Sequence, residues 1–205
     1  SRQVQVRTRA PVNHVILLDG TMSSLDDGHE THIGLIYKDL LSVSGAGNIR
    51  LLYEGGAQWH DWSATISIIE GRGINRQIRR AYGWLASHYR PGDRIFLMGY
   101  SRGAFAVRSL AGVIDQVGLL HPEHATVRQI REAYRHYQFD TTPDTRATFA
   151  ERYCHADVPI EMVGVFDTVK SLGIRAPFVW RWSDVKHSFH NDELGTSVRH
   201  GYHAI

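Results

Sequence analysis

The 205-residue chain has a single cysteine, Cys154, which excludes an internal disulfide framework. No stretch approaches the roughly 20 apolar residues of a membrane-spanning helix, and residues 1–9 lack the apolar core of a signal peptide. The net charge is only +2 and the basic residues are scattered, which argues against a nucleic-acid partner. With 42% hydrophobic residues, the chain is typical of one soluble globular domain spanning residues 1–205.

Short apolar runs that end at turn residues are typical of buried parallel strands. Such runs lie at 14–18, 49–53, 94–98 and 161–166. Helical spacing of apolar residues is found at 33–41, from 74 onward and at 104–117. Strands that alternate with helices predict an α/β fold, in which a mostly parallel sheet is covered by helices on both faces.

Three segments depart from this alternation. Residues 55–73 are rich in glycine and tryptophan and predict a long surface loop, and the tail from Ser171 onward has no regular pattern. Residues 123–153 predict a helical insertion at the point where a lid over an apolar pocket would lie. The apolar stripe of this insertion, which we expect to face the core, consists of Val127, Ile130 and Tyr134.

Residues 99–103 read Gly-Tyr-Ser-Arg-Gly and match the G-x-S-x-G pattern of a nucleophile elbow. Glycines two positions before and after the serine let the backbone turn sharply, so that the hydroxyl is lifted above the sheet. The motif requires a strand before it and a helix after it, and the sequence predicts both. We therefore predict that Ser101 is the nucleophile of a serine hydrolase with an α/β-hydrolase-like fold.

A serine nucleophile needs a histidine base, and the base needs a carboxylate that orients it. In this fold class the chain order is serine, acid, histidine. Asp167 follows the strand at 161–166 and is the natural acid, whereas its rivals Asp184 and Asp192 follow no strand. The pattern leaves the base open among the histidines after Asp167, which are His187, His190, His200 and His203.

Four segments in a fixed order carry a family resemblance. They are Asp-Gly-Thr at 19–21, Gly-Tyr-Ser-Arg-Gly-Ala at 99–104, Val-Gly-Val-Phe-Asp-Thr-Val at 163–169 and Arg-His-Gly-Tyr-His-Ala at 199–204. Together they resemble the family of uncharacterised α/β-hydrolase domains that includes antibacterial phospholipase effectors of type VI secretion. The resemblance covers most of the chain.

The resemblance assigns roles to individual residues. It implies that Ser101 is the nucleophile, Asp167 the acid and His203 the base, because the family's histidine stands directly before an alanine. His200 is the runner-up for the base. The resemblance also implies an oxyanion hole made by the backbone amides of Gly20 or Thr21 together with that of Arg102.

These observations predict an ester hydrolase that acts through an acyl-enzyme on Ser101 and prefers lipid-like esters. No cofactor is expected, and no metal ion, because the sequence has neither a cysteine pair nor an H-E-x-x-H helix. The alternative is an interaction module that has the same fold and no turnover. The expected location is the bacterial cytoplasm, or outside the cell for a secreted effector; the sequence identifies no secretion or immunity partner.

Overall fold

The computed structural model describes residues 9–20, 23–45, 47–55, 66–139, 141–166 and 195–204, with the backbone alone at 66–72. The elements are, in chain order, β1 (Asn13–Leu18), α1 (His32–Ser44), β2 (Ile49–Glu54), α2 (Ile66–His88), β3 (Arg94–Tyr100), α3 (Arg102–Gln116), the 3₁₀ helix η2 (Pro122–His124), α4 (Val127–Gln138), α5 (Pro143–Tyr153), β4 (Ile160–Phe166) and β5 (Val198–Ala204). As far as the structure describes the chain, no helix has both the length and the apolar composition needed to cross a membrane.

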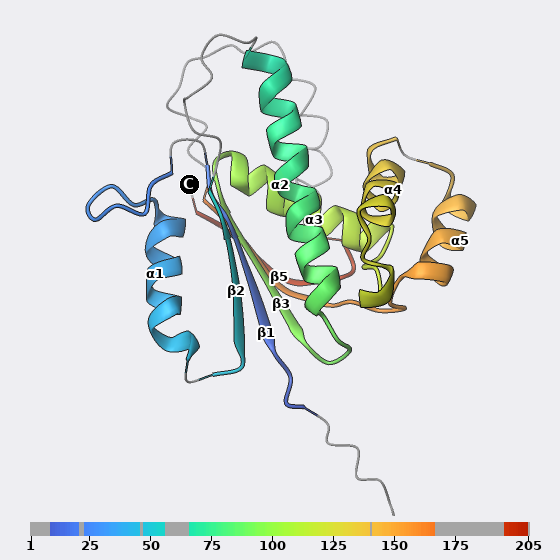
Figure 1. The fold of residues 1–205 in the computed structure, drawn as a ribbon, viewed down its shortest axis with the longest axis horizontal. Coiled ribbons are helices and arrows are strands. Elements are labelled where there is room, and N and C mark those ends of the chain that lie inside the picture. Colours follow the sequence, from blue (N-terminus) through green and yellow to red (C-terminus); the bar gives the residue numbers. More distant parts are fainter. Residues whose placement is uncertain are drawn as a thin grey trace, which may run out of the picture.

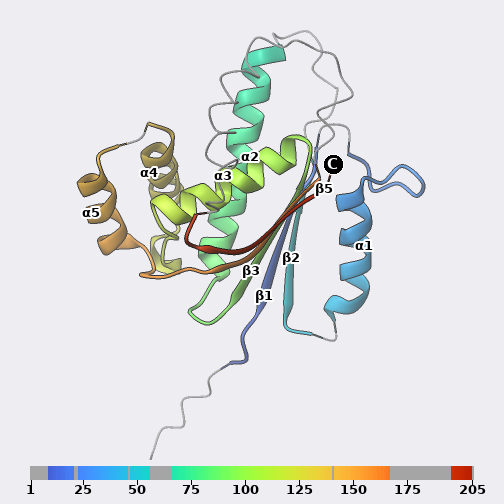
Figure 2. The ribbon, with the colours of Figure 1, turned by 180° about the vertical axis from the view of Figure 1, so that it is seen from behind.

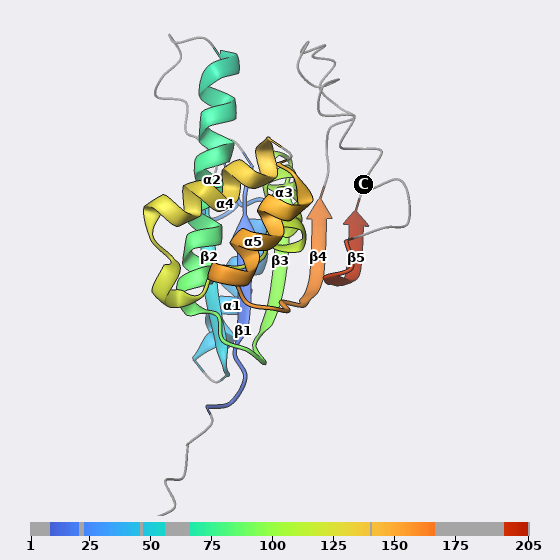
Figure 3. The ribbon, with the colours of Figure 1, turned by 90° about the vertical axis from the view of Figure 1, so that its right-hand side faces the viewer.

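The strands form one sheet in the order β2-β1-β3-β4-β5, and every neighbouring pair is parallel. Figure 3 shows β4 and β5 side by side with their arrowheads pointing the same way. Helix α1 covers one face of this sheet, and α2 and α3 cover the other (Figures 1 and 2). The predicted α/β class, with a parallel sheet between helices, is therefore confirmed.

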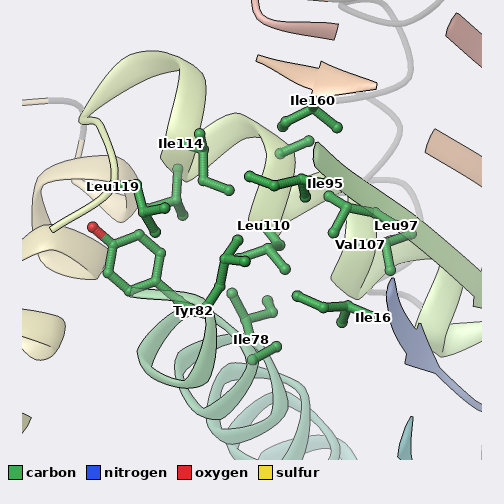
Figure 4. Close-up of a cluster of buried hydrophobic side chains, with 14 of the residues drawn as sticks. Ile16, Ile78, Tyr82, Ile95, Leu97, Val107, Leu110, Ile114, Leu119 and Ile160 are labelled. Atoms are coloured by element: carbon green, nitrogen blue, oxygen red, sulfur yellow. The ribbon is translucent and has the colours of Figure 1, made fainter. Parts of the chain in front are cut away.

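The larger core lies between the sheet and the helices α2 and α3 (Figure 4). Strand residues alternate between the two faces, so Ile16 and Leu97 enter this core while Val15 and Leu17 pack toward α1. Helix α3 is held by buried side chains along most of its length, Leu110 among them. This packing anchors the helix that begins directly after Ser101.

Two expectations from the sequence are wrong. The segment at 55–73 is not loop throughout, because α2 begins at Ile66. Gly73 lies inside this helix, and apart from the helix's own backbone and chain neighbours the structure describes nothing within 4 Å of where a Cβ would stand. The tail contains β5, an edge strand whose side chains are mostly exposed. Backbone bonding to β4 rather than an apolar run makes this segment a strand, so hydrophobic patterning could not reveal it.

Helices α4 and α5 make up most of the predicted insertion, and α4 packs on α2 and α3. Tyr134 is buried and donates a hydrogen bond to the Asn75 side chain at 2.7 Å, while Ile130 packs against the core. Val127, the third residue of the stripe, is 67% exposed. Two of the three stripe residues thus face the core as expected, and a lid function for the insertion stays a prediction.

The strand order reverses between β1 and β3. The chain leaves β1 through α1 to reach β2 on one side, whereas β3 is added on the other side of β1. In open parallel sheets, ligands bind outside the carboxyl ends of the strands at this kind of switch point. The turns after β1 and β3, which contain Asp19 and Ser101, border that position.

The core predicts a sharp contrast between two leucines. Leu110→Ala removes a fully buried side chain from α3 and should lower the free energy of unfolding by about 2–5 kcal/mol. Leu35→Ala on α1 is the matched control, because Leu35 is 48% exposed and its loss should cost about 0.5 kcal/mol or less. Urea unfolding followed by circular dichroism measures both, and equal losses would contradict the described core.

Candidate active site

Ser101 occupies the tight turn between β3 and α3. Its backbone angles are φ 53° and ψ −116°, and it is the only non-glycine residue with positive φ in the described ranges. A side chain in such a conformation costs on the order of 1–3 kcal/mol, and such strain is concentrated at functional sites. Its amide donates to the Phe166 carbonyl oxygen at 3.0 Å, which ties the turn to the end of β4.

The two glycines of the motif are required by contacts between backbone segments. A Cβ at Gly99 would overlap the carbonyl oxygen of Gly103, and a Cβ at Gly103 would overlap the carbonyl oxygen of Leu18. The first turn of α3 therefore lies directly against the end of β1. The G-x-S-x-G pattern follows from this crowding as well as from the sharp turn itself.

The turn after β1 lies against the same elbow. A Cβ at Gly20 would stand 3.1 Å from the Ser101 Cβ and 3.2 Å from the Tyr100 carbonyl oxygen. Gly20, one of the residues predicted to supply an oxyanion amide, lies in this turn. The Gly20 N–H, however, donates to the Asp19 carboxylate at 2.7 Å, so it is already engaged within the turn.

Asp19 is fully buried and accepts two further hydrogen bonds. The Thr31 hydroxyl donates at 2.6 Å and the Tyr53 hydroxyl at 2.8 Å, both to the oxygen that Gly20 does not use. The backbone of Asp19 is held as well, because its N–H donates to the Glu54 carbonyl oxygen at 2.9 Å. The carboxylate thus joins β1 to the start of α1 and the end of β2.

Sequence reasoning missed the partners of Asp19. Tyr53 comes from β2, and Gln77, whose amide donates to the Asp19 carbonyl oxygen at 3.4 Å, comes from α2. No local pattern connects these distant positions. Thr31 could have been found, because it is a threonine directly before a helix and its hydroxyl accepts from the Gly34 N–H at 3.0 Å as an N-cap.

The two histidines at the end of the chain both lie on β5, and the strand register separates them. His203 pairs with Val165, which pairs with Gly99. Because paired residues share a face, His203 lies on the face of the sheet that α3 covers. His200 pairs with Met162, is three residues earlier and therefore lies on the opposite face.

The beginning of β5 is attached to the end of α3. The Asp115 carboxylate accepts from the Ser197 amide at 3.1 Å and from the Ser197 hydroxyl at 2.7 Å. The Ser197 carbonyl oxygen accepts from the Ile160 amide at 2.7 Å, so the same residue also reaches β4. These bonds set the register of the strand that contains His203.

Several predicted residues lie outside the described residues. They are Thr21, Asp167, Asp184, His187, His190 and Asp192. Asp167 is nevertheless the residue directly after Phe166, whose carbonyl oxygen accepts from the Ser101 amide.

Comparison with known proteins places the chain in a family. The family model described as "T6SS, Phospholipase effector Tle1-like, catalytic domain" matches residues 13–205. The chain belongs to this family. The predicted resemblance is thereby confirmed; the lipolytic activity, the serine mechanism and the particular substrate are proposals.

A second comparison finds a eukaryotic relative. The "Uncharacterized protein YEL023C" of Saccharomyces cerevisiae is 36% identical over 110 residues, which are 49% of this chain and 16% of that protein. The chain therefore spans only a small part of this relative's length.

In this Tle1-like domain, a cluster of three aromatic rings lies next to the elbow on the side of α1; the rings belong to His32, Tyr100 and Phe166. His32, the first residue of α1, stacks on Phe166 with ring centroids 5.6 Å apart and an interplanar angle of 4°. The Tyr100 ring lies 6.5 Å from the His32 ring. Tyr100 and Phe166 are the last residues of β3 and β4. The rings therefore belong to the residues directly before Ser101 and Asp167, the predicted nucleophile and acid.

The crowding at the elbow predicts that Gly103→Ala disrupts the site. The added methyl group meets the β1 backbone, which cannot move aside as a side chain could, so we expect at least about 3 kcal/mol of lost stability and loss of ester hydrolysis. Gly73→Ala in α2 is the control; it meets open space and should leave stability equal or raise it by up to about 1 kcal/mol. Thermal melts and ester turnover are the measurements, and wild-type behaviour of Gly103→Ala would contradict the described contact.

Proposed function

We propose that this domain hydrolyses carboxylic esters of phospholipids through an acyl-enzyme on Ser101. The observation that carries the proposal is the strained serine at a strand-to-helix turn, placed at the switch point of the parallel sheet. Membership in a family of phospholipase effectors supports the lipid as the substrate class. Esters of long acyl chains are expected to react better than acetate esters.

The proposed reaction has two steps. His203 takes the proton of the Ser101 hydroxyl while Oγ bonds to the ester carbonyl carbon, and Asp167 orients the imidazole. The tetrahedral intermediate then releases the alcohol, which receives the proton from His203, and leaves the acyl group on Ser101. Water, deprotonated by the same histidine, attacks the acyl carbon, so that the fatty acid leaves and the serine hydroxyl is restored. This sequence needs no cofactor.

The oxyanion would be bound by backbone amides. Because the Gly20 N–H is engaged by Asp19, we propose the amides of Thr21 and Arg102 as the donors, with Gly20 shaping the turn. Arg102 is the first residue of α3 and directly follows the nucleophile, the position whose amide contributes to the oxyanion hole in this fold class. The positive end of the helix dipole also favours negative charge at this position.

The strand register supports His203 over His200 as the base. His203 lies in the same cross-strand row as Gly99, at the carboxyl edge of the sheet and on the face of α3. His200 is on the other face and about 10 Å further from that edge, at about 3.3 Å per residue.

The alternative, a module of this fold without turnover, gives no account of the backbone strain at Ser101. The strain lowers the stability of the fold by about 1–3 kcal/mol, and backbone strain of this kind is concentrated at functional sites. A fluorophosphonate probe separates the two functions, since only a competent nucleophile is labelled.

The decisive variant is Ser101→Ala. Hydrolysis of long-chain p-nitrophenyl esters and release of fatty acid from phospholipid vesicles should fall by about 10³-fold or more, with nearly unchanged melting temperature. The control reaction is a phosphodiester substrate with and without chelator. Residual ester turnover above about one tenth of wild type would remove Ser101 from the mechanism, and chelator-sensitive phosphodiester cleavage without ester turnover would contradict the proposed reaction.

Two histidine variants test the base. His203→Ala should lower kcat by about 10³-fold, whereas His200→Ala, on the opposite face of the same strand, should stay within about threefold of wild type. Steady-state kinetics on one soluble ester measures both. A dead His200→Ala beside an active His203→Ala would overturn the assignment and leave Ser101 in place.

A further inference from the structure

A buried carboxylate beside the nucleophile needs an explanation. Burying a charged group without compensation costs several kcal/mol, and Asp19 is 0% exposed. Among the described residues it forms no ion pair with lysine or arginine; its partners are the neutral donors Gly20, Thr31 and Tyr53. This buried carboxylate lies in the turn after β1, whose next residue, Gly20, contacts Ser101.

The carboxylate does not have the contacts of a triad acid. Its two oxygens accept from a backbone amide and two hydroxyl groups, and no described histidine donates to it. Burial raises the pKa of Tyr53 to about 12, so this hydroxyl stays a donor at any working pH. The Asp19 side chain therefore fixes the conformation of its own turn relative to α1 and β2.

The turn at Asp19 is held from several sides at once. Besides its carboxylate bonds, the Asp19 carbonyl oxygen accepts from Gln77, and the Gln77 amide also donates to the Glu54 carbonyl oxygen at 3.2 Å. The Asp19 amide donates to the same Glu54 oxygen. The amide, the carbonyl group and the side chain of Asp19 are thus all held by hydrogen bonds. The next residue, Gly20, contacts the turn at Ser101.

We propose that Asp19 is a positioning residue for the hydrolysis at Ser101. Its carboxylate holds the Gly20 N–H and connects it to Thr31 and Tyr53, so the turn stays pressed against the serine before substrate binds. Preorganised donors stabilise a developing oxyanion because they need no rearrangement during the reaction. Asp19 acts through this turn and does not contact the substrate. The inference rests on the proposed function.

Asp19→Asn tests the inference, because the amide keeps the shape of the side chain but replaces one acceptor oxygen with a donor. In one orientation the new NH₂ group faces the Gly20 N–H, and in the other it faces the Thr31 and Tyr53 hydroxyl groups, so the turn loses part of its anchor either way. We expect kcat to fall by about 10-fold to 100-fold, less than the loss of a whole oxyanion donor can cost, with KM within about threefold. The rate of Ser101 labelling by a fluorophosphonate should fall in parallel.

Asp93→Asn is the matched control. Asp93 is also a buried aspartate, and its carboxylate accepts from the amides of Val12 at 2.9 Å and Arg90 at 3.1 Å, from His14 at 2.8 Å and from Arg9 at 2.6 Å, but it lies at the amino ends of the strands. It should lower the melting temperature and leave kcat per folded molecule unchanged. If Asp19→Asn folds and keeps the wild-type kcat, Asp19 is only a structural residue and the inference is wrong.

Tyr53→Phe keeps the inference testable if Asp19→Asn does not fold. It retains the carboxylate and removes one anchor, so we expect kcat to fall by about three- to tenfold while KM holds. A stability loss with unchanged kcat would overturn the inference. Failure of the proposed function looks different: wild-type protein would then show neither ester turnover nor labelling of Ser101.

Discussion

The contact on which the site depends is the one between the first turn of α3 and the end of β1. The Gly103 backbone lies so near the Leu18 carbonyl oxygen that no side chain fits between them. Ser101, in its strained conformation, lies two residues before this contact, and Gly20 of the turn after β1 lies against it. The strain of about 1–3 kcal/mol is offset by burial elsewhere in α3, because one fully buried leucine such as Leu110 contributes about 1.5–3 kcal/mol.

The two ends of the sheet use buried aspartates in different ways. At the amino ends, Asp93 accepts from the Arg9 guanidinium and from His14, so the carboxylate is balanced by a cation and fastens the start of β1 to β3. At the carboxyl ends, the donors to the Asp19 carboxylate are all neutral as far as the described residues go. Among the described residues, the Asp19 carboxylate therefore holds its turn by hydrogen bonds from neutral groups and without an ion pair.

Local patterns in the sequence predicted what depends on local structure. The strands before Ser101 and Asp167 were visible as apolar runs, and the elbow was visible because its two glycines and its serine lie within five consecutive residues. The role of Asp19 was not visible, since its partners come from α1, β2 and α2. Strand β5 was missed because an edge strand held by backbone bonds carries no apolar run. Sequence spacing left His200 and His203 nearly equivalent, and only the pairing of β5 with β4 puts them on opposite faces.

The order of strands in the sheet constrains how a triad can form. Nucleophile, acid and base are proposed at the ends of β3, β4 and β5, which are neighbours in that order. Neighbouring strands are about 4.8 Å apart, so the backbone of β5 is roughly 10 Å from that of β3. A base on β5 must therefore extend across the end of β4 to reach Ser101, and it can do so only from the carboxyl edge and on the face of α3. The proposed base His203 lies near that edge and on that face, whereas His200 lies further from the edge and on the other face, so the register favours His203.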